Sequence, residues 1–340
     1  MHKTSNNSSP VSLEGQVAVV AGATRGAGRG IAHMLGEAGA TVYCSGRSIT
    51  NNLSPVGRPE TIDETAQLVT AAGGKGIAVQ TDHSQPEQVR ALFDRIAADE
   101  KQLDILVNDI GAEYLNIWDP LAQAKIEAGF AFLDAAVRTH IITTHAATPL
   151  LQSQGHGLIV EVTDGNHHGY RGAFFYDLAK TQLMRLAYAT ARELAPSGVL
   201  ALAVTPGFLR SEAMLEAFEV TEANWQDASS KVMGFSESET PCFVGRAVAA
   251  LAADPQVARF SGQTLASWDL AREYGFTDID GRSPHWMDFA LGSLRTIITN
   301  GGPANNNERD WLAAWCSNLE DQEQHKELLA ELKRIEPLNQ

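Results

Sequence analysis

Short apolar runs separated by longer mixed segments recur along the first two thirds of the chain. The runs cover residues 16–21, 41–45, 76–80, 103–108, 157–163 and 199–205. Such runs are typical of strands buried on both faces of a parallel sheet. The segments between them have the length and the glycine-terminated ends of crossover helices. The pattern predicts a doubly wound α/β fold, the Rossmann fold.

The pattern changes after the sixth apolar run, and this change sets the predicted domain boundaries. We predict one Rossmann domain over residues 13–275, with a further helix at about 241–253 and a short strand within 261–267. Residues from about 208 to 240 carry Met, Phe and Trp at irregular spacing and are predicted to form a lid. Residues 276–340 show helical charge patterning and are predicted to form a largely helical C-terminal extension.

The composition is that of a globular protein, with 44% hydrophobic and 20% charged residues. The formal net charge of −15 opposes binding to nucleic acid and to anionic membranes. No apolar run approaches the roughly 18 to 20 residues that span a bilayer, and the first twelve residues lack the apolar core of a secretory signal. We therefore expect a cytoplasmic protein. Cys44, Cys242 and Cys316 lack metal-ligand spacing, so we expect reduced packing residues and no metal site.

A glycine-rich segment follows the first predicted strand and leads into a helix. Glycine permits the tight turn and lets the backbone approach a pyrophosphate, which the N–H groups at the start of the helix then bind. A glycine pattern alone is often only a turn, but the order of strand, glycines and helix is typical of dinucleotide binding. The predicted cofactor contacts in this segment are Gly22, Thr24, Arg25, Gly26, Ala27 and Gly28.

The end of the second predicted strand indicates which dinucleotide binds. An NAD(H) site usually has an acidic residue there, whereas the 2′-phosphate of NADP(H) needs cations. The sequence here is Gly46-Arg47-Ser48, without an acidic residue. Arg47 and Arg25 can clamp a phosphate, although two solvated surface arginines are the alternative. We predict NADP(H). The polar segment 46–59 either covers a ligand or lies on the surface.

Tyr176 and Lys180 lie one helical turn apart in a predicted helix, so their side chains share a face. A neighbouring ammonium favours phenolate and lowers the pKa of a tyrosine toward neutrality. Such a phenol is a useful proton donor or acceptor. The spacing alone is common by chance, and the position after a buried strand carries the argument.

Taken together, these residues resemble the short-chain dehydrogenase/reductase family. The resemblance covers roughly residues 13–267, and residues 261–275 resemble the branch called dehydrogenase/reductase family member 1. It implies hydride transfer between NADP(H) and a small carbonyl or alcohol substrate, with Tyr176 exchanging the proton. Lys180 would lower the pKa of Tyr176 and also hold the nicotinamide ribose. The resemblance also implies a homodimer or homotetramer, packed through helices at about 120–153 and 175–195.

The same resemblance implies further contacts with the dinucleotide. Asp82 would meet the adenine ring and Asn108 would hold the central strand, although capping a helix and merely ending a strand are the alternatives. The residues implied at the nicotinamide end are Pro206, Gly207 and Ser211.

Three positions depart from the family pattern. Residues 108–111 read Asn-Asp-Ile-Gly instead of Asn-Asn-Ala-Gly, and Ala136 falls where the family has a catalytic asparagine. The catalytic serine is replaced by Asp164, counted from the strand end, or by Thr163, counted from Tyr176. We favour Asp164. An ionised carboxylate would oppose the charge that grows on a substrate oxygen, so Asp164 would have to be protonated to help reduction.

These departures leave other functions open. Histidines 140, 145, 167 and 168 are either substitute proton relays or packing and surface residues, and Glu113 is another acid to consider. A nucleotide-binding sensor or scaffold without redox chemistry is the main alternative, because two catalytic positions have changed. A cofactor-dependent isomerase or lyase is the third.

Overall fold

The computed structural model describes residues 11–335 except 54–56, 112–116, 320–321 and 323–324. Its centre is a parallel sheet in the order β3-β2-β1-β4-β5-β6-β7. The strands are β1 Val17–Ala21, β2 Thr41–Gly46, β3 Lys75–Gln80, β4 Ile105–Asn108, β5 Gly157–Val162, β6 Val199–Thr205 and β7 Thr264–Ala266. The first six are the six predicted strands, and the doubly wound fold is confirmed.

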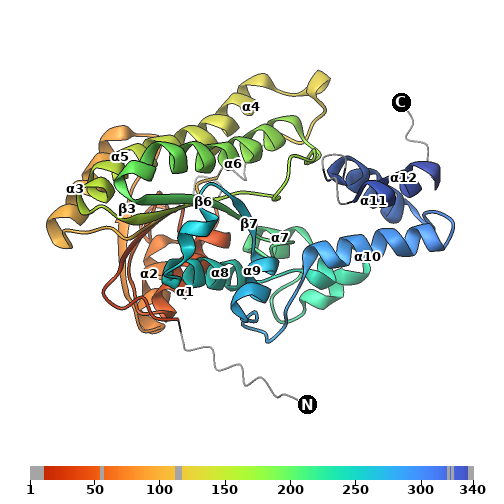
Figure 1. Ribbon diagram of the computed structural model, residues 1–340. Coiled ribbons are helices and arrows are strands. Elements are labelled where there is room, and N and C mark those ends of the chain that lie inside the picture. The colour runs from red at the N-terminus through yellow and green to blue at the C-terminus, as the bar shows by residue number, and fades with distance from the viewer. Residues whose placement is uncertain (1–10, 54–56, 112–116, 320–321, 323–324, 336–340) are drawn as a thin grey trace, which may run out of the picture.

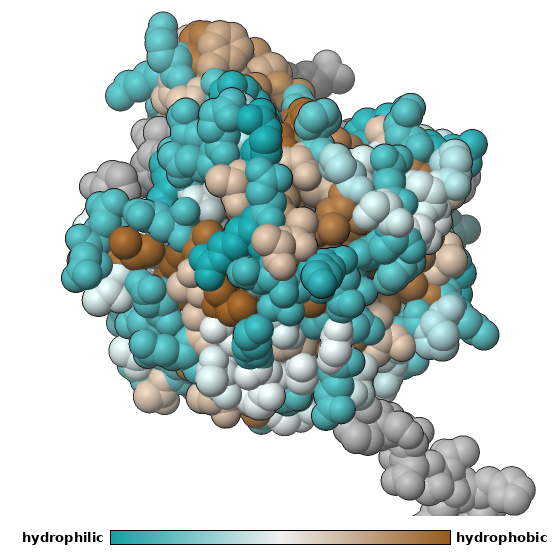
Figure 2. Space-filling view, turned by 90° about the vertical axis from the view of Figure 1, so that its left-hand side faces the viewer, coloured by the Kyte–Doolittle hydropathy of each residue, from teal (hydrophilic) through white to brown (hydrophobic). Residues whose placement is uncertain are grey.

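Helices cover both faces of the sheet (Figure 1). One layer consists of α1 Gly26–Glu37, α2 Ile62–Ala71, α8 Pro241–Ala253 and α9 Ser267–Tyr274. The other consists of α3 Pro86–Asp99, α4 Ile126–Leu133, α5 Thr139–Gln154 and α6 Phe174–Leu194. On the side where α3 and β3 lie, the surface is mostly hydrophilic, and hydrophobic groups show only in separate small areas (Figure 2). Such a surface suits the edge strand β3, because polar groups discourage pairing with another chain.

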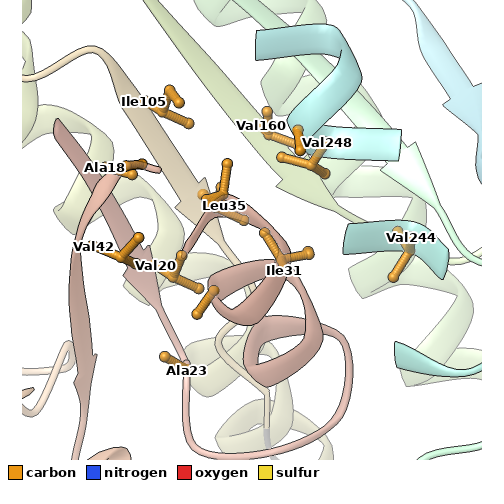
Figure 3. Packing of buried hydrophobic residues seen from close by; sticks show 14 of the residues in the cluster. Ala18, Val20, Ala23, Ile31, Leu35, Val42, Ile105, Val160, Val244 and Val248 are labelled. Atoms are coloured by element: carbon orange, nitrogen blue, oxygen red, sulfur yellow. The ribbon is translucent and has the colours of Figure 1, made fainter. Parts of the chain in front are cut away.

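The larger part of the core lies between the sheet and the layer of α1 and α8. Val20 on β1 packs with Ile31 on α1 and Val248 on α8, all fully buried (Figure 3). The two helices cross very closely at Gly30, where an added Cβ would lie 2.1 Å from the Pro241 carbonyl oxygen. A side chain there would push α8 away from the sheet, so this glycine sets the spacing of the layer.

The predicted lid follows β6 and contains α7 Glu212–Ala217 and two short 3₁₀ turns. Its two ends meet in an isolated parallel bridge between Leu209 and Glu239. The amide of Arg210 donates to the Glu239 carbonyl at 2.8 Å, and the amide of Glu239 donates to the Phe208 carbonyl at 2.9 Å. This segment, for which we keep the name lid, is therefore a loop that is closed at its base.

The C-terminal extension contains α10 Trp286–Thr299, α11 Asn306–Leu319 and α12 Lys326–Ile335. These helices lie beyond α7 and α9, far from β3 (Figure 1). Their buried leucines, such as Leu294, Leu312 and Leu332, form a cluster of their own, against which Met233 of the lid packs. No helix among the described residues combines the length and the apolar character that crossing a membrane requires.

Candidate active site

A cavity of about 420 Å³ lies at the carboxyl ends of the strands, where the strand order reverses between β1 and β4. In this fold, ligands bind at such a reversal. The predicted residues on its wall are Gly22, Thr24, Arg25, Arg47, Asp82, Tyr176, Lys180 and Ser211. The other predicted residues do not line it: Gly26, Ala27, Gly28, Asn108, Thr163, Asp164, Pro206 and Gly207.

The glycine loop packs tightly against the end of β4. Gly22 has a φ of +92°, and an added Cβ would lie 2.3 Å from the Asp109 carbonyl oxygen. Gly28 leaves no room for a side chain either, because its Cβ would lie 2.4 Å from the Gly22 carbonyl oxygen. The amide of Gly28 donates to Asp109 Oδ2 at 2.5 Å. Asp109 stands where the family pattern has an asparagine, and its carboxylate thus holds the start of α1.

Arg25 and Arg47 lie at the end of the cavity that the sequence assigns to the adenosine. Arg25 Nε lies 3.3 Å from Glu60 Oε2, and Arg25 Nη2 is buried without a hydrogen-bond partner among the described residues. Arg47 is exposed. Arg58 pairs with Glu60 at 3.1 Å and also contacts Glu216 of the lid. Burial raises the pKa of Glu60, but the hydrogen bond and charge of Arg58 bring it below the ordinary value.

Asp82 lies on the wall beside Arg47. Its Oδ1 accepts hydrogen bonds from the amide and the hydroxyl of Ser84, at 2.9 and 2.7 Å. Burial raises the pKa of Asp82, and these bonds together with the charge of Arg47 lower it below the ordinary value. The N-cap of α3 is Gln85, so Asp82 forms a turn and does not cap that helix.

At the other end of the cavity, Tyr176 and Lys180 extend from the first two turns of α6. The Tyr176 hydroxyl donates to Asp164 Oδ2 at 2.8 Å, and Lys180 Nζ lies 5.6 Å from the centre of the Tyr176 ring. The Thr163 hydroxyl is buried and donates instead to the Lys180 carbonyl at 2.7 Å. Of the two candidate positions, Asp164 is therefore the one whose side chain meets Tyr176.

Arg171 organises the loop between Asp164 and Tyr176, and the sequence analysis missed it. Its guanidinium donates to the carbonyl oxygens of Asp164, His167 and Gly169. It also lies 3.4 Å from Asp177 Oδ1. A single arginine in a loop belongs to no sequence motif. Only the folded chain shows that its planar guanidinium donates to three carbonyl oxygens.

Aromatic and apolar side chains surround Tyr176 on the cavity side. The ring centre of Trp118 lies 5.1 Å from that of Tyr176, and the ring centre of Phe132 lies 6.2 Å away. Ile117 packs in the same cluster as Phe132 and Tyr176 and also lines the cavity. The wall suits a substrate whose surface near the reacting group is apolar.

The position of the family asparagine lies in a π-helical segment, Asp134–Arg138, between α4 and α5. Ala136 is buried in this segment and lines the cavity. Such π segments occur often at functional sites, because the extra residue in the turn shifts the side chains that follow. Here the shift brings only a methyl group to the wall.

One turn further along, His140 forms a buried pair with Glu161 of β5. His140 Nδ1 lies 2.6 Å from Glu161 Oε2, and Nε2 lies 3.0 Å from the Ile110 carbonyl oxygen. A carbonyl only accepts, so Nε2 carries a hydrogen, and a further proton must lie between Nδ1 and the carboxyl. His140 is thus buried in a hydrogen-bonded pair, and Glu161 was missed because its partner is 21 positions away.

Asn108 is the last residue of β4 and also bonds to neighbouring elements. It therefore ends a strand and holds it in place, so each of the two interpretations from the sequence is partly right. Its Nδ2 donates to Thr144 Oγ1 at 3.0 Å and to Glu161 Oε1 at 2.9 Å. Its Oδ1 is buried without a partner among the described residues. These bonds tie β4, α5 and β5 together behind the cavity.

Glu239 is a second buried glutamate that the sequence analysis missed. Its Oε2 accepts from the Ser267 hydroxyl at 2.7 Å and from the Gly207 amide at 2.9 Å. Its Oε1 is buried without a partner in the described part of the chain. Burial raises the pKa of Glu239 to about 8. This side chain holds the segment that leads from β6 into the lid.

The other residues considered from the sequence contribute less. His145 and His168 are exposed, and His167 Nδ1 accepts from the Gly169 amide at 3.1 Å. Glu113 and the side chain of Cys316 lie outside the described residues. Cys44 and Cys242 are buried free thiols. Within the described ranges, no cluster of His, Cys, Asp and Glu has the arrangement of a metal site.

Comparisons with known proteins show the family and the fold of this chain. The model of the short chain dehydrogenases matches residues 16–222. Dehydrogenase/reductase SDR family member 1 of Mus musculus is 35% identical over 301 residues, 86% of this chain and 92% of that protein. The NADPH-dependent aldehyde reductase-like protein of Arabidopsis thaliana is 29% identical over 209 residues, 60% of this chain and 76% of that protein. The structure of a short chain dehydrogenase from Mycobacterium thermoresistibile, 21% identical, has a TM-score of 0.67 over 81% of this chain and 92% of that one.

Proposed function

The chain belongs to the short-chain dehydrogenase/reductase family, in the branch of SDR family member 1, and from this premise we propose that it reduces apolar ketones or aldehydes with NADPH, or oxidises the corresponding alcohols with NADP⁺. The observation that carries the proposal is the arrangement of Tyr176, bonded to Asp164, and Lys180 at one end of a crevice that begins at Arg25 and Arg47.

The described residues fit a dinucleotide phosphate. Arg25 Nη2 is a buried donor without a partner in the described chain, and Arg47 lies exposed beside it on the same wall. Charge-assisted bonds from these two arginines would hold a 2′-phosphate. The Arabidopsis relative, named as NADPH-dependent, favours the same cofactor. The nicotinamide would supply or accept the hydride.

The protein's own part in the reaction is to place and move a proton. Tyr176 Oη would give its proton to the developing alkoxide, and the Lys180 ammonium would stabilise the phenolate that remains. Asp164 would replace the family serine. It accepts from Tyr176 Oη in the structure, and a protonated Asp164 would instead donate to the substrate oxygen.

The remaining predicted residues would position the cofactor. Asp82 lies on the wall at the adenosine end, and Ser211 lies on the wall at the start of α7. Pro206 and Gly207 would contact the nicotinamide, and the Gly207 amide is fixed by Glu239. Asn108 would act from behind the wall, through its bonds to Thr144 and Glu161.

The test is turnover with NADPH and a panel of apolar carbonyl compounds, followed through nicotinamide absorbance. Tyr176→Phe is expected to lower turnover about 100-fold or more, with NADPH affinity retained, because acid–base assistance has this size. Tyr188→Phe is the matched control, since it removes a hydroxyl from a half-exposed tyrosine three turns further along α6. Equal turnover in Tyr176→Phe and wild type would overturn the assignment.

The choice of cofactor has its own test in Arg47→Asp. Loss of a charge-assisted bond and gain of a carboxylate should lower the NADP(H)/NAD(H) affinity ratio at least tenfold. An unchanged ratio would show that Arg47 does not bind the 2′-phosphate.

A second candidate function is supported by Ala136 and Asp164. With a methyl group in place of the asparagine and a carboxyl group in place of the serine, the chain would bind NADP(H) as a sensor or scaffold. NADPH binding without turnover of any carbonyl compound would favour it. Interconversion of isomers or elimination with catalytic NADP⁺ would identify an isomerase or lyase.

We also propose a cytoplasmic homodimer or homotetramer that packs through α4, α5 and α6. Ile126 and Phe130 on α4 and Ile141 on α5 each leave between 42% and 59% of their surface exposed. Burial of such side chains between subunits would be favourable. Light scattering that shows a monomer at micromolar concentration would contradict this arrangement.

A further inference from the structure

Two carboxylates lie on the backbone amides at the start of α1. The Gly26 amide donates to Glu212 Oε2 at 2.8 Å, and the Gly28 amide donates to Asp109 Oδ2 at 2.5 Å. The first N–H groups of a helix have no partners within it and carry partial positive charge. The first turn of α1 contains no acidic residue of its own, so both carboxylates come from elsewhere in the chain.

The two carboxylates belong to structures of different kinds. Asp109 directly follows β4, at the carboxyl end of the central strands. Glu212 is the first residue of α7, in the lid, and is 186 positions away from Gly26. The amides at this helix end are those that a dinucleotide's pyrophosphate uses in a Rossmann fold. A lid side chain therefore lies where a cofactor's anionic group binds.

We propose that Glu212 competes with the cofactor's pyrophosphate for the start of α1 and thereby couples the lid to cofactor binding; the inference rests on the proposed function. Before the dinucleotide binds, the Glu212 carboxylate neutralises the amide end of α1 and ties α7 to the glycine loop. The pyrophosphate brings negative charge to the same helix end. It displaces the carboxylate, and α7 loses this tie.

A second set of contacts supports the coupling. Glu216, one turn after Glu212, contacts Arg58, and Arg58 pairs with Glu60. Glu60 in turn lies 3.3 Å from Arg25, the predicted 2′-phosphate ligand. One lid helix thus reaches the pyrophosphate end and, through Arg58, the 2′-phosphate end of the same crevice. The start of α7 also forms part of the cavity wall, through Ala213 and Met214.

The proposed competition predicts in which direction NADPH affinity changes when the charge of Glu212 is removed. Glu212→Gln keeps an oxygen that can accept from the Gly26 amide but removes the negative charge. Two like charges at this range repel appreciably even in a partly hydrated site, and salt screens the repulsion. Glu212→Gln should therefore bind NADPH about threefold to tenfold more tightly than wild type at low salt, and the difference should shrink at 0.5 M salt.

The experiment is a titration of wild type, Glu212→Gln and Glu193→Gln with NADPH and with adenosine 2′-monophosphate. Glu193 is exposed and lies 13 residues after Lys180 on α6, about 20 Å along the helix, so its variant controls for net charge. Adenosine 2′-monophosphate has the 2′-phosphate but no pyrophosphate. Its affinity should be equal in all three proteins, which also shows that Glu212→Gln is folded.

Tighter NADPH binding by Glu212→Gln alone, with unchanged binding of adenosine 2′-monophosphate, supports the inference. Equal or weaker NADPH binding by Glu212→Gln overturns it and leaves the proposed function intact. Equal tightening by Glu193→Gln also overturns it, because the effect is then one of net charge. If wild type and Glu212→Gln both fail to bind NADPH, the proposed function fails and the inference fails with it.

Discussion

The cavity is flanked by two buried glutamates with opposite surroundings. Glu161, at the end of β5, meets a histidine and an amide, and both of its oxygens have partners. Glu239, at the base of the lid, meets only a hydroxyl and a backbone amide, and one of its oxygens has none among the described residues. Each nevertheless helps to hold a backbone segment: Glu161 through His140, whose Nε2 bonds the Ile110 carbonyl, and Glu239 directly at the Gly207 amide.

The difference shows two ways of keeping a carboxyl group inside a protein. Beside His140, the proton is shared with a base, and hydrogen bonds satisfy the rest of the group. Neither of the hydrogen-bond partners of Glu239, the Ser267 hydroxyl and the Gly207 amide, is a base, and burial raises the pKa of Glu239 to about 8, so the neutral acid is the form held near pH 7. The first solution depends on a specific partner, and the second depends on pH.

The largest expected effect is the loss of folding stability when Glu161 is replaced, and it tests whether this carboxyl group depends on its specific partners. Glu161→Leu leaves His140 and Asn108 buried without their acceptor, and breaking a buried pair in this way costs about 3–5 kcal/mol. Glu161→Gln should lose much less, because its amide can donate to a neutral His140 while its oxygen still accepts from Asn108. Urea denaturation of both variants measures the free energy of unfolding.

The contrast between the two substitutions serves as the control, since both remove the same ionisable carboxyl group. Equal losses in Glu161→Leu and Glu161→Gln would mean that charge, and not hydrogen bonding, decides the cost at this position.

The next effect concerns pH at Glu239. The pKa of this group rises from an ordinary 4.5 to about 8 in the folded chain, so the folded protein binds the extra proton between these values. The contribution of Glu239 to stability is full below pH 4.5 and falls by about 1 kcal/mol per pH unit as the pH rises toward 8. Denaturation of wild type and Glu239→Gln from pH 6 to 8 measures it as the difference between the two slopes.

Glu239→Gln is a close match in shape and keeps an acceptor for Ser267 and Gly207. Its stability should change less with pH than that of the wild type. Parallel curves for the two proteins would show that Glu239 does not gain a proton on folding.

The smallest expected effect is the stability cost of removing the Ser267 hydroxyl, and it tests how Glu239 is held. Ser267→Ala removes the hydroxyl that donates to Glu239 and should cost about 1 kcal/mol. That hydrogen bond lowers the pKa of Glu239 in the folded chain, so its loss should extend the pH-dependent fall in stability to higher pH. A fall that ends at the same pH as in the wild type would argue that Ser267 serves only packing.

Features with a local signal could be predicted from the sequence. The buried strands, the glycine loop at Gly22 and Gly28 and the helix at 241–253 each depend on nearby residues, and the structure confirms these elements. The interpretation of Asp82 as a possible helix cap was wrong, because Gln85 occupies that position. Tyr176 and Lys180 lie together because they share one helix face.

The interactions that the sequence analysis missed join residues far apart in the chain. Glu161 finds His140 only when α5 packs on β5, and Glu212 finds Gly26 only when the lid folds over α1. Arg171 donates to backbone carbonyl oxygens. Because every residue has a carbonyl oxygen, no residue type in the sequence indicates which ones Arg171 binds. The backbone groups and the packing of elements decide these contacts, and neither leaves a periodic pattern.

The bridge between Leu209 and Glu239 has a consequence for how this enzyme family can change. Because the lid leaves and re-enters the fold at neighbouring points, its length between them can change without moving β6 or α8. The entropy of closing such a loop grows only slowly with its length. The part of the lid beyond α7 can therefore vary in length while the sheet keeps its place, whereas the start of α7 cannot, because Ser211 and Met214 line the cavity and Glu212 binds the start of α1.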